Sequence, residues 1–216
     1  MRDANMEIRD LIGARYTLIY IVSWEETRVI NALGKICDDH MIGQVIVWDA
    51  ARGLLLKQDN KFVSLESKQS NGDDDEDIIS QQPTTDLEAA LDYAISLAED
   101  QELRQKVVQG KESKGPLFVF CDIWRHLDPQ VLRPQVERKL RYIAEAFRGT
   151  SMTMVMLSPQ LELPTALEKC VTVVDYPLPT YDEISVTVEN ATKHLKGRKL
   201  LATDSFAREP VIRSLM

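Results

Sequence analysis

The sequence predicts an α/β fold in which a mostly parallel sheet is flanked by helices. Short, uncharged apolar segments recur along the chain, as is typical of strands that are covered on both faces. Between them lie longer segments whose apolar residues recur every three or four positions, the spacing of an amphipathic helix. This alternation favours parallel strands that are joined by right-handed crossovers. We therefore expect one domain over residues 1–216.

The N-terminal part is expected to supply a helix, a strand and a second helix. An amphipathic helix that ends at Gly13 precedes a strand over 16–22, which is rich in β-branched and aromatic residues. Ser23 and Glu26 have the spacing of a capping box, in which a hydroxyl and a carboxylate satisfy the free backbone donors at a helix start. The second helix should therefore begin there and pack on the sheet through apolar residues of 29–37.

The middle of the chain is expected to be irregular. A strand over 44–48 is followed at 52–63 by a short hairpin or an irregular excursion. Residues 67–85 lack apolar periodicity and include five consecutive acidic residues, 73–77, whose mutual repulsion opposes compaction. We interpret 67–85 as a disordered insert, a solvated loop in preference to a site for a basic partner or divalent cations.

The C-terminal part repeats the strand and helix pattern. Asp86 opens a helix, a strand follows at 116–121, and Pro134 suits the first position of a helix that ends at Gly149. Thr180 and Glu183 repeat the capping-box spacing at the start of a further helix. The remaining expected elements are strands over 152–157 and 171–174 and helices over 164–169 and 206–216.

The carboxyl ends of the strands, where open α/β sheets bind ligands, lack a phosphate-binding loop. A nucleotide-binding sheet follows its first strand with a glycine-rich loop whose N–H groups and lysine hold the phosphates. Here the chain reads Ser23-Trp24-Glu25-Glu26, so carboxylates and a bulky indole stand at the electropositive helix start. The pattern G-x-x-x-x-G-K-[ST] occurs nowhere in the sequence. We predict that this chain alone neither binds nor hydrolyses ATP, and we assign no catalytic, cofactor-binding or metal-binding residue.

Two carboxylates leave an alternative open. Asp122 follows the third strand where an ATPase holds its magnesium-linked acid, but Ile123 stands where the catalytic glutamate would be. Asp49 follows the second strand. The two could serve a small magnesium-dependent phosphoacceptor or enzyme, whereas the simpler interpretation is that Asp122 caps a turn.

A contact surface is the other candidate site. Trp24, Trp124, Arg125 and His126 follow strands whose ends we expect at one edge of the sheet. Because Trp and Arg are favoured interface anchors, these residues could form an aromatic and basic surface for a protein partner. The competing interpretation is that they are partly buried packing residues.

Composition excludes several functional classes. The net charge of −8 repels the phosphate backbone of nucleic acids. The polar N-terminus does not resemble a signal peptide, and the longest apolar runs are far short of the roughly 20 residues that cross a bilayer. The cysteines are widely separated and odd in number, which indicates reduced thiols in a cytosol-type compartment.

Several stretches resemble one known family. Residues 11–26, 116–124, 140–149, 155–159 and 173–179 are similar to the AAA-type ATPases that are encoded as hypothetical chloroplast reading frame forty-six in plastids and cyanobacteria. The opening stretch and the Asp-Tyr-Pro-Leu-Pro at 175–179 carry the resemblance most specifically. The acidic insert departs from the family pattern.

The resemblance implies a degenerate RecA/AAA-like fold without the phosphate loop, and it implies that this chain is the N-terminal half. The family's ATPase module, with its phosphate loop, acidic pair and arginine finger, lies in the second half, so ATP and magnesium are expected only for a full-length ATPase. This half is then expected to be non-catalytic and to contact partners, clients or its own ATPase module, or to shape assembly of a full-length oligomer. The resemblance places the protein in the cyanobacterial cytosol or the chloroplast stroma.

Overall fold

The computed structural model describes residues 3–40, 43–58, 61–65, 85–107 and 115–195. Backbone contacts divide the chain into two compact units, Met1–Tyr176 (unit 1) and Pro177–Met216 (unit 2), and each is described by itself. The single domain that we expect over 1–216 stays a prediction. The predicted disordered insert at 67–85, except Thr85, and the predicted helix at 206–216 lie outside the described residues.

Unit 1 is built on a seven-stranded mixed sheet with the order β4-β3-β2-β5-β6-β1-β7. The strands are β1 (Leu18–Val22), β2 (Val45–Asp49), β3 (Gly53–Gln58), β4 (Lys61–Ser64), β5 (Leu117–Cys121), β6 (Thr153–Ser158) and β7 (Val171–Asp175). Pairing is parallel from β2 through β7 in this order, whereas β3 and β4 extend the β2 edge as an antiparallel hairpin. The expected mostly parallel sheet is confirmed, and the hairpin alternative for 52–63 is the correct one.

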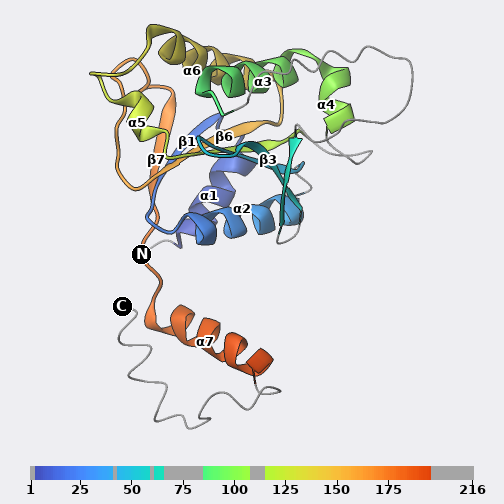
Figure 1. Cartoon of the computed structure of the whole chain (residues 1–216), viewed down its shortest axis with the longest axis vertical. Coiled ribbons are helices and arrows are strands. Elements are labelled where there is room, and N and C mark those ends of the chain that lie inside the picture. Colours follow the sequence, from blue (N-terminus) through green and yellow to red (C-terminus); the bar gives the residue numbers. More distant parts are fainter. Residues whose placement is uncertain (1–2, 41–42, 59–60, 66–84, 108–114, 196–216) are drawn as a thin grey trace. The chain divides into compact units, whose positions relative to one another are not determined.

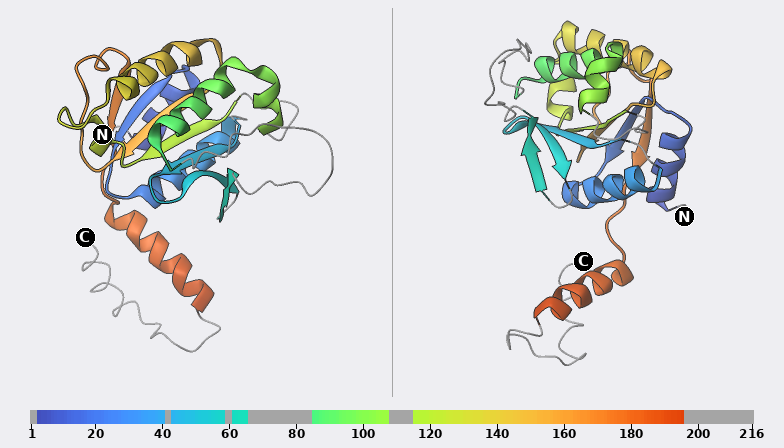
Figure 2. Two further views of the ribbon diagram at one scale, coloured as in Figure 1. Left: turned by 45° about the horizontal axis from the view of Figure 1, so that its top comes forward. Right: turned by 90° about the vertical axis from the view of Figure 1, so that its right-hand side faces the viewer.

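Helices cover both faces of the sheet (Figures 1 and 2). The helices of unit 1 are α1 (Ala4–Gly13), α2 (Glu26–His40), α3 (Leu87–Glu99), α4 (Gln101–Val107), α5 (Trp124–Leu127), α6 (Pro134–Ala146) and the 3₁₀ turn η2 (Phe147–Gly149). One apolar layer joins α1 and α2 to the sheet, and a second joins α3 and α6 to the opposite face. Because side chains alternate along a strand, Leu18 and Tyr20 of β1 enter the second layer, while Ile19 and Ile21 enter the first.

The layer under α3 and α6 contains an aromatic cluster. Phe118 has its ring centroid 6.3 Å from that of Phe120 and 6.2 Å from that of Phe147, and Trp48 lies 5.5 Å from Phe120. All four side chains are buried. Offset and tilted aromatic pairs add about 0.5–1.5 kcal/mol each beyond the area that they bury, so this cluster is a main source of stability.

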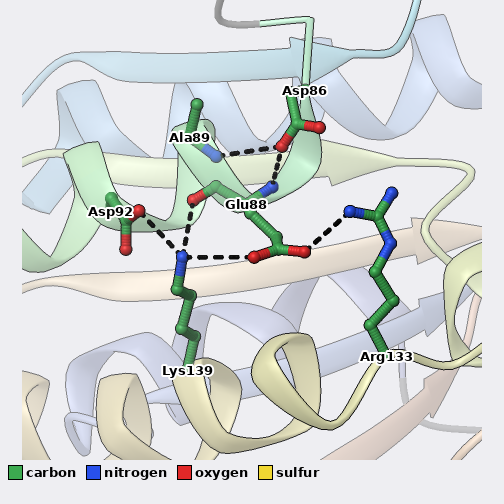
Figure 3. A network of polar contacts seen from close by, with 6 residues as sticks. All are labelled: Asp86, Glu88, Ala89, Asp92, Arg133 and Lys139. Carbon is green, nitrogen blue, oxygen red and sulfur yellow. Dashed lines mark hydrogen bonds and ion pairs between the residues drawn. The ribbon is translucent and has the colours of Figure 1, made fainter.

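A polar network joins α3 to α6 above that layer (Figure 3). The Asp86 carboxylate caps α3 by accepting hydrogen bonds from the backbone N–H groups of Glu88 and Ala89, as expected. Lys139 donates to Asp92 at 2.8 Å and lies 3.6 Å from Glu88. Partly exposed ion pairs of this kind contribute at most about 1 kcal/mol each, so the network adds little to the stability of the domain.

One predicted helix is wrong. Residues 165–170 form successive turns, in which Leu167 N–H donates to Pro164 O and Cys170 N–H donates to Leu167 O, both at 2.8 Å. These bonds join residues three positions apart, so the segment closes 3₁₀-type turns in place of an α-helix.

The described part of unit 2 is the helix α7 (Tyr181–Leu195) with the residues that precede it. Its capping box forms as predicted: the Glu183 carboxylate accepts from Thr180 N–H at 2.7 Å, and the Thr180 hydroxyl accepts from Glu183 N–H at 3.4 Å. Across the described residues of both units, we find no helix with the length and apolar character that a membrane span requires.

Candidate functional site

A cleft of about 410 Å³ opens at the carboxyl ends of β1, β5 and β6, and we call it the strand-end cleft. It is lined by Ser23, Trp24, Glu26, Asp122, Trp124, Arg125, Leu157, Ser158, Pro159 and Gln160. In the sheet, β6 lies between β5 and β1. The chain leaves β1 toward α2 on one face and leaves β5 toward α6 on the other. Such a divergence is the topological switch point at which open α/β sheets bind ligands.

The connection from β1 to α2 is very short, because only Ser23, Trp24 and Glu25 separate the strand from the helix. The predicted capping box between Ser23 and Glu26 is wrong. Ser23 N–H donates to Ser158 O at 2.9 Å, and the Ser23 hydroxyl accepts from Glu25 N–H at 3.1 Å. The Ser23 N–H, which the Glu26 carboxylate would have satisfied, is therefore bonded to β6 in the sheet. The helix α2 begins only at Glu26.

The start of α2 carries negative charge. Glu25 forms an ion pair with Arg28 at 2.8 Å, and Glu26 stands in the first turn of the helix and lines the strand-end cleft. A glutamate is favourable here because it complements the positive end of the helix dipole. An incoming phosphate would meet this carboxylate in place of a ring of free N–H groups.

The end of β5 places one carboxylate in the cleft. Asp122 has a φ of 53°, a left-handed conformation that aspartate tolerates better than most residues, and its N–H donates to Leu157 O at 2.9 Å. Among the described residues, no hydrogen bond or ion pair reaches its carboxylate. Ile123 is fully buried in the core, so the position after Asp122 offers no general base.

Asp49 does not share the cleft with Asp122. Its carboxylate accepts hydrogen bonds from the backbone N–H groups of Ala51 and Arg52 and forms an ion pair with the Arg52 guanidinium at 2.7 Å. Within the described residues, no group of three or more His, Cys, Asp or Glu side chains is placed to hold a metal ion. Of the two carboxylates in the magnesium alternative, Asp122 alone lines the cleft.

The Cys121 thiol at the end of β5 has a raised pKa. Burial raises the pKa of its thiol, and the negative charges of Glu26, Asp49 and Asp122 raise that pKa further. The thiol stays protonated and unreactive. Glu26, Asp49 and Asp122 therefore place negative charge near Cys121, the last residue of β5.

The predicted contact residues divide into two groups. Trp24 is 75% exposed at the cleft, and the Arg125 guanidinium lies 4.5 Å from the centroid of the partly buried Trp124 ring. His126 turns away from the cleft, and its ring lies 6.0 Å from that of Trp48. Burial, followed by the nearby charge of Arg133, lowers the pKa of His126, so this imidazole packs as a neutral group. The structure thus brings together Trp24, Trp124 and Arg125 and leaves His126 out.

Tyr20 and Ser158 shape one wall of the cleft, and sequence reasoning missed both roles. The Tyr20 hydroxyl donates to Gln160 O at 2.6 Å and accepts from Glu162 N–H at 3.4 Å. Burial raises the pKa of Tyr20, which keeps the hydroxyl protonated as a donor. The Ser158 hydroxyl accepts from Trp124 N–H at 3.4 Å. The available signal was the position of Ser158 at the end of a buried strand, directly before Pro159.

A family model and a curated relative match the sequence of this chain. The sequence model of the SpoVK-like AAA ATPase N-terminal domain matches residues 4–176, which is nearly all of unit 1. A relative from Guillardia theta, the uncharacterized AAA domain-containing protein ycf46, is 25% identical over 174 residues. That match covers 81% of this chain but 27% of the relative, so the chain spans about a quarter of the relative's length.

A solved structure, the HORMA:CdnC:Trip13 complex of E. coli MS115-1, contains a similar chain at 14% identity and a TM-score of 0.48. That match covers 97% of this chain and 60% of the other. The expected family resemblance and the RecA-like α/β architecture are confirmed by the family match. The chain belongs to the SpoVK-like AAA ATPase N-terminal domain family.

Proposed function

We propose that unit 1 is a non-catalytic domain of an AAA ATPase and that its strand-end cleft contacts a protein partner in place of a nucleotide. The observation that carries this proposal is the connection from β1 to α2, in which Ser23, Trp24 and Glu25 stand where a phosphate loop belongs. ATP and magnesium would then be used only by a separate ATPase module of a full-length protein.

Length and charge at this connection both oppose nucleotide binding. The phosphate-gripping pattern G-x-x-x-x-G-K-[ST] needs a loop that wraps the phosphates with backbone N–H groups. The direct step from β1 to α2 leaves no such loop. A phosphate about 4 Å from the Glu26 or Asp122 carboxylate would meet a repulsion of roughly 1–4 kcal/mol per charge pair.

Exposure of the aromatic side chain supports contact with a protein. Trp24 is left 75% exposed beside the cleft. Covering this indole with a partner would remove apolar surface from water and so favour binding. Trp and Arg dominate the energetics of protein interfaces, and Trp124 and Arg125 adjoin the same cleft.

The partner would be the domain's own ATPase module, a client or another subunit, and contact there would let this domain recognise substrates or shape assembly. Family membership supports action beside an ATPase module. The resemblance to plastid and cyanobacterial ATPases supports a location in the cyanobacterial cytosol or the chloroplast stroma.

A thermal-unfolding scan with and without millimolar MgATP tests the non-catalytic part of this proposal. A ligand at about 100 times its dissociation constant stabilises the folded state by about 2.7 kcal/mol, which raises Tm by roughly 5–10 °C for a chain of this size. We expect no rise. A concentration-dependent rise that disappears in Asp122→Asn, which removes the exposed carboxylate of the cleft, would show a nucleotide site and overturn the proposal.

A further inference from the structure

We propose that the strand-end cleft binds a basic side chain, an arginine or a lysine, of a partner protein. This inference rests on the proposed function, because it names the chemistry of the partner that the same cleft would contact. It follows from the charges that line the cleft and from the exposed indole beside them.

The charges of the cleft favour a cation. Glu26 and Asp122 line it with carboxylates, and Arg125 is the one cation among the lining residues. Arg125 already has a partner in the chain, since its guanidinium lies over the Trp124 ring at 4.5 Å. The Asp122 carboxylate, in contrast, receives no hydrogen bond or ion pair from any described residue and is exposed to solvent. An incoming guanidinium or ammonium group would provide the charge that this carboxylate lacks.

Trp24 supplies the second element of recognition. Its indole is 75% exposed and lines the same cleft as the two carboxylates. A cation over an indole face gains about 0.5–1 kcal/mol at an exposed site and more when it is desolvated. Among the described residues, an arginine lies over an aromatic ring at three places: Arg125 over Trp124 at 4.5 Å, Arg28 over Tyr176 at 4.7 Å and Arg52 over Phe62 at 5.5 Å. A basic residue of a partner could therefore stack on Trp24 while its charge approaches Asp122.

An acidic segment is the competing occupant and fits the cleft less well. It would gain one attraction, from Arg125, and would meet two repulsions, from Glu26 and Asp122. The net charge of −8 on the whole chain adds a long-range preference for basic partners. Electrostatic complementarity of this kind selects among partners and accelerates their association.

The indole N–H resonances of the 216-residue chain test the proposal, because the three tryptophans report different places. The probes are two seven-residue Ser-Gly peptides with blocked ends, one with a central arginine and one with a central glutamate. At millimolar peptide and low ionic strength, the arginine peptide should shift the Trp24 and Trp124 signals. Trp48, which is 1% exposed in the core, should stay unmoved and serves as the internal control.

Substitutions make the test specific. Asp122→Asn is preferred to alanine because asparagine also tolerates the left-handed backbone at this position. We expect each of three variants to weaken the binding of the arginine peptide by about two- to fivefold: Asp122→Asn, Glu26→Gln and Trp24→Leu. The matched control is Asp38→Asn, which removes the same charge from α2 about 18 Å farther along the helix than Glu26 and should have little effect.

Equal shifts with the arginine and glutamate peptides, or equal weakening by Asp122→Asn and Asp38→Asn, would overturn the basic-side-chain inference. A chain that responds to neither peptide would overturn it as well. In these cases the proposed function still stands if MgATP leaves the same indole signals unmoved. If MgATP moves the signals of Trp24 and Trp124 and the arginine peptide does not, both proposals fail.

Discussion

Removing the Tyr20 hydroxyl tests how the wall of the strand-end cleft is held. Tyr20→Phe keeps the fully buried ring and deletes the group that donates to Gln160 O at 2.6 Å and accepts from Glu162 N–H at 3.4 Å. The first bond is short and the second is long, so the loss is close to that of one hydrogen bond. Because Gln160 is exposed, water can reach its carbonyl in the variant. We therefore expect a loss of about 1 kcal/mol in unfolding free energy and a Tm lower by about 2–4 °C.

Urea unfolding of Tyr20→Phe beside Tyr93→Phe provides the measurement and its control. Tyr93 is a partly buried tyrosine of α3 for which no hydroxyl hydrogen bond is found among the described residues. Its variant should unfold within about 0.5 kcal/mol of the parent chain. If Tyr20→Phe is as stable as Tyr93→Phe, the hydroxyl does not hold the segment after β6, and our account of that wall is incorrect.

Four further outcomes are expected. Phe118→Ala, which empties the centre of the aromatic cluster, should cost about 3–5 kcal/mol in urea unfolding, and a loss below 1 kcal/mol would contradict this packing. Lys139→Met should cost less than about 1 kcal/mol, and the difference from the parent should vanish in 1 M salt if the ion pairs with α3 are its cause. Because the pKa of His126 is lowered by folding, the unfolded chain binds more protons, so stability should decrease as pH falls below about 6.5; His126→Asn should flatten this part of the pH profile, and an unchanged profile would contradict the lowered pKa. Millimolar MgCl₂ should leave the Tm of the parent and of Asp122→Ala unchanged, whereas stabilisation of the parent alone would favour the magnesium-dependent alternative.

Most elements of the fold can be predicted from the sequence, because the central strands are covered on both faces and are therefore apolar throughout. Residues 117–121 are apolar throughout and form the buried strand β5, and the alternation of such strands with amphipathic helices needed no long-range information. The order of the strands was not predictable in the same way. β1 lies between β6 and β7, which follow it by more than 130 residues, and only tertiary packing brings these strands together.

The two capping-box sequences show how tertiary contacts override a local pattern. Thr180 and Glu183 cap α7 as their spacing predicts, since no sheet partner competes for Thr180 N–H. Ser23 follows a strand, and the carbonyl of Ser158 in the neighbouring strand takes its N–H instead. The same spacing therefore gives a cap in one place and a strand extension in the other.

The candidate site was predictable in part. Trp24, Trp124 and Arg125 meet because they follow parallel strands, whose carboxyl ends share one edge of the sheet. His126 was included because it is adjacent in sequence, but one residue along a helix turns the side chain by about 100°, which directs His126 toward Trp48. The short helix α5 that causes this rotation contains four residues, too few for apolar periodicity to reveal it.

Site-specific photo-crosslinking in the source cells tests the central claim, contact with a protein at the strand-end cleft, most directly. A photoreactive phenylalanine analogue would replace Trp24, which is 75% exposed at the cleft, and in a control chain Met6, which is 46% exposed on α1. We predict a discrete protein adduct from position 24 that is absent from position 6 and that Asp122→Asn weakens. Equal labelling from both positions, or no adduct from position 24, would contradict the account.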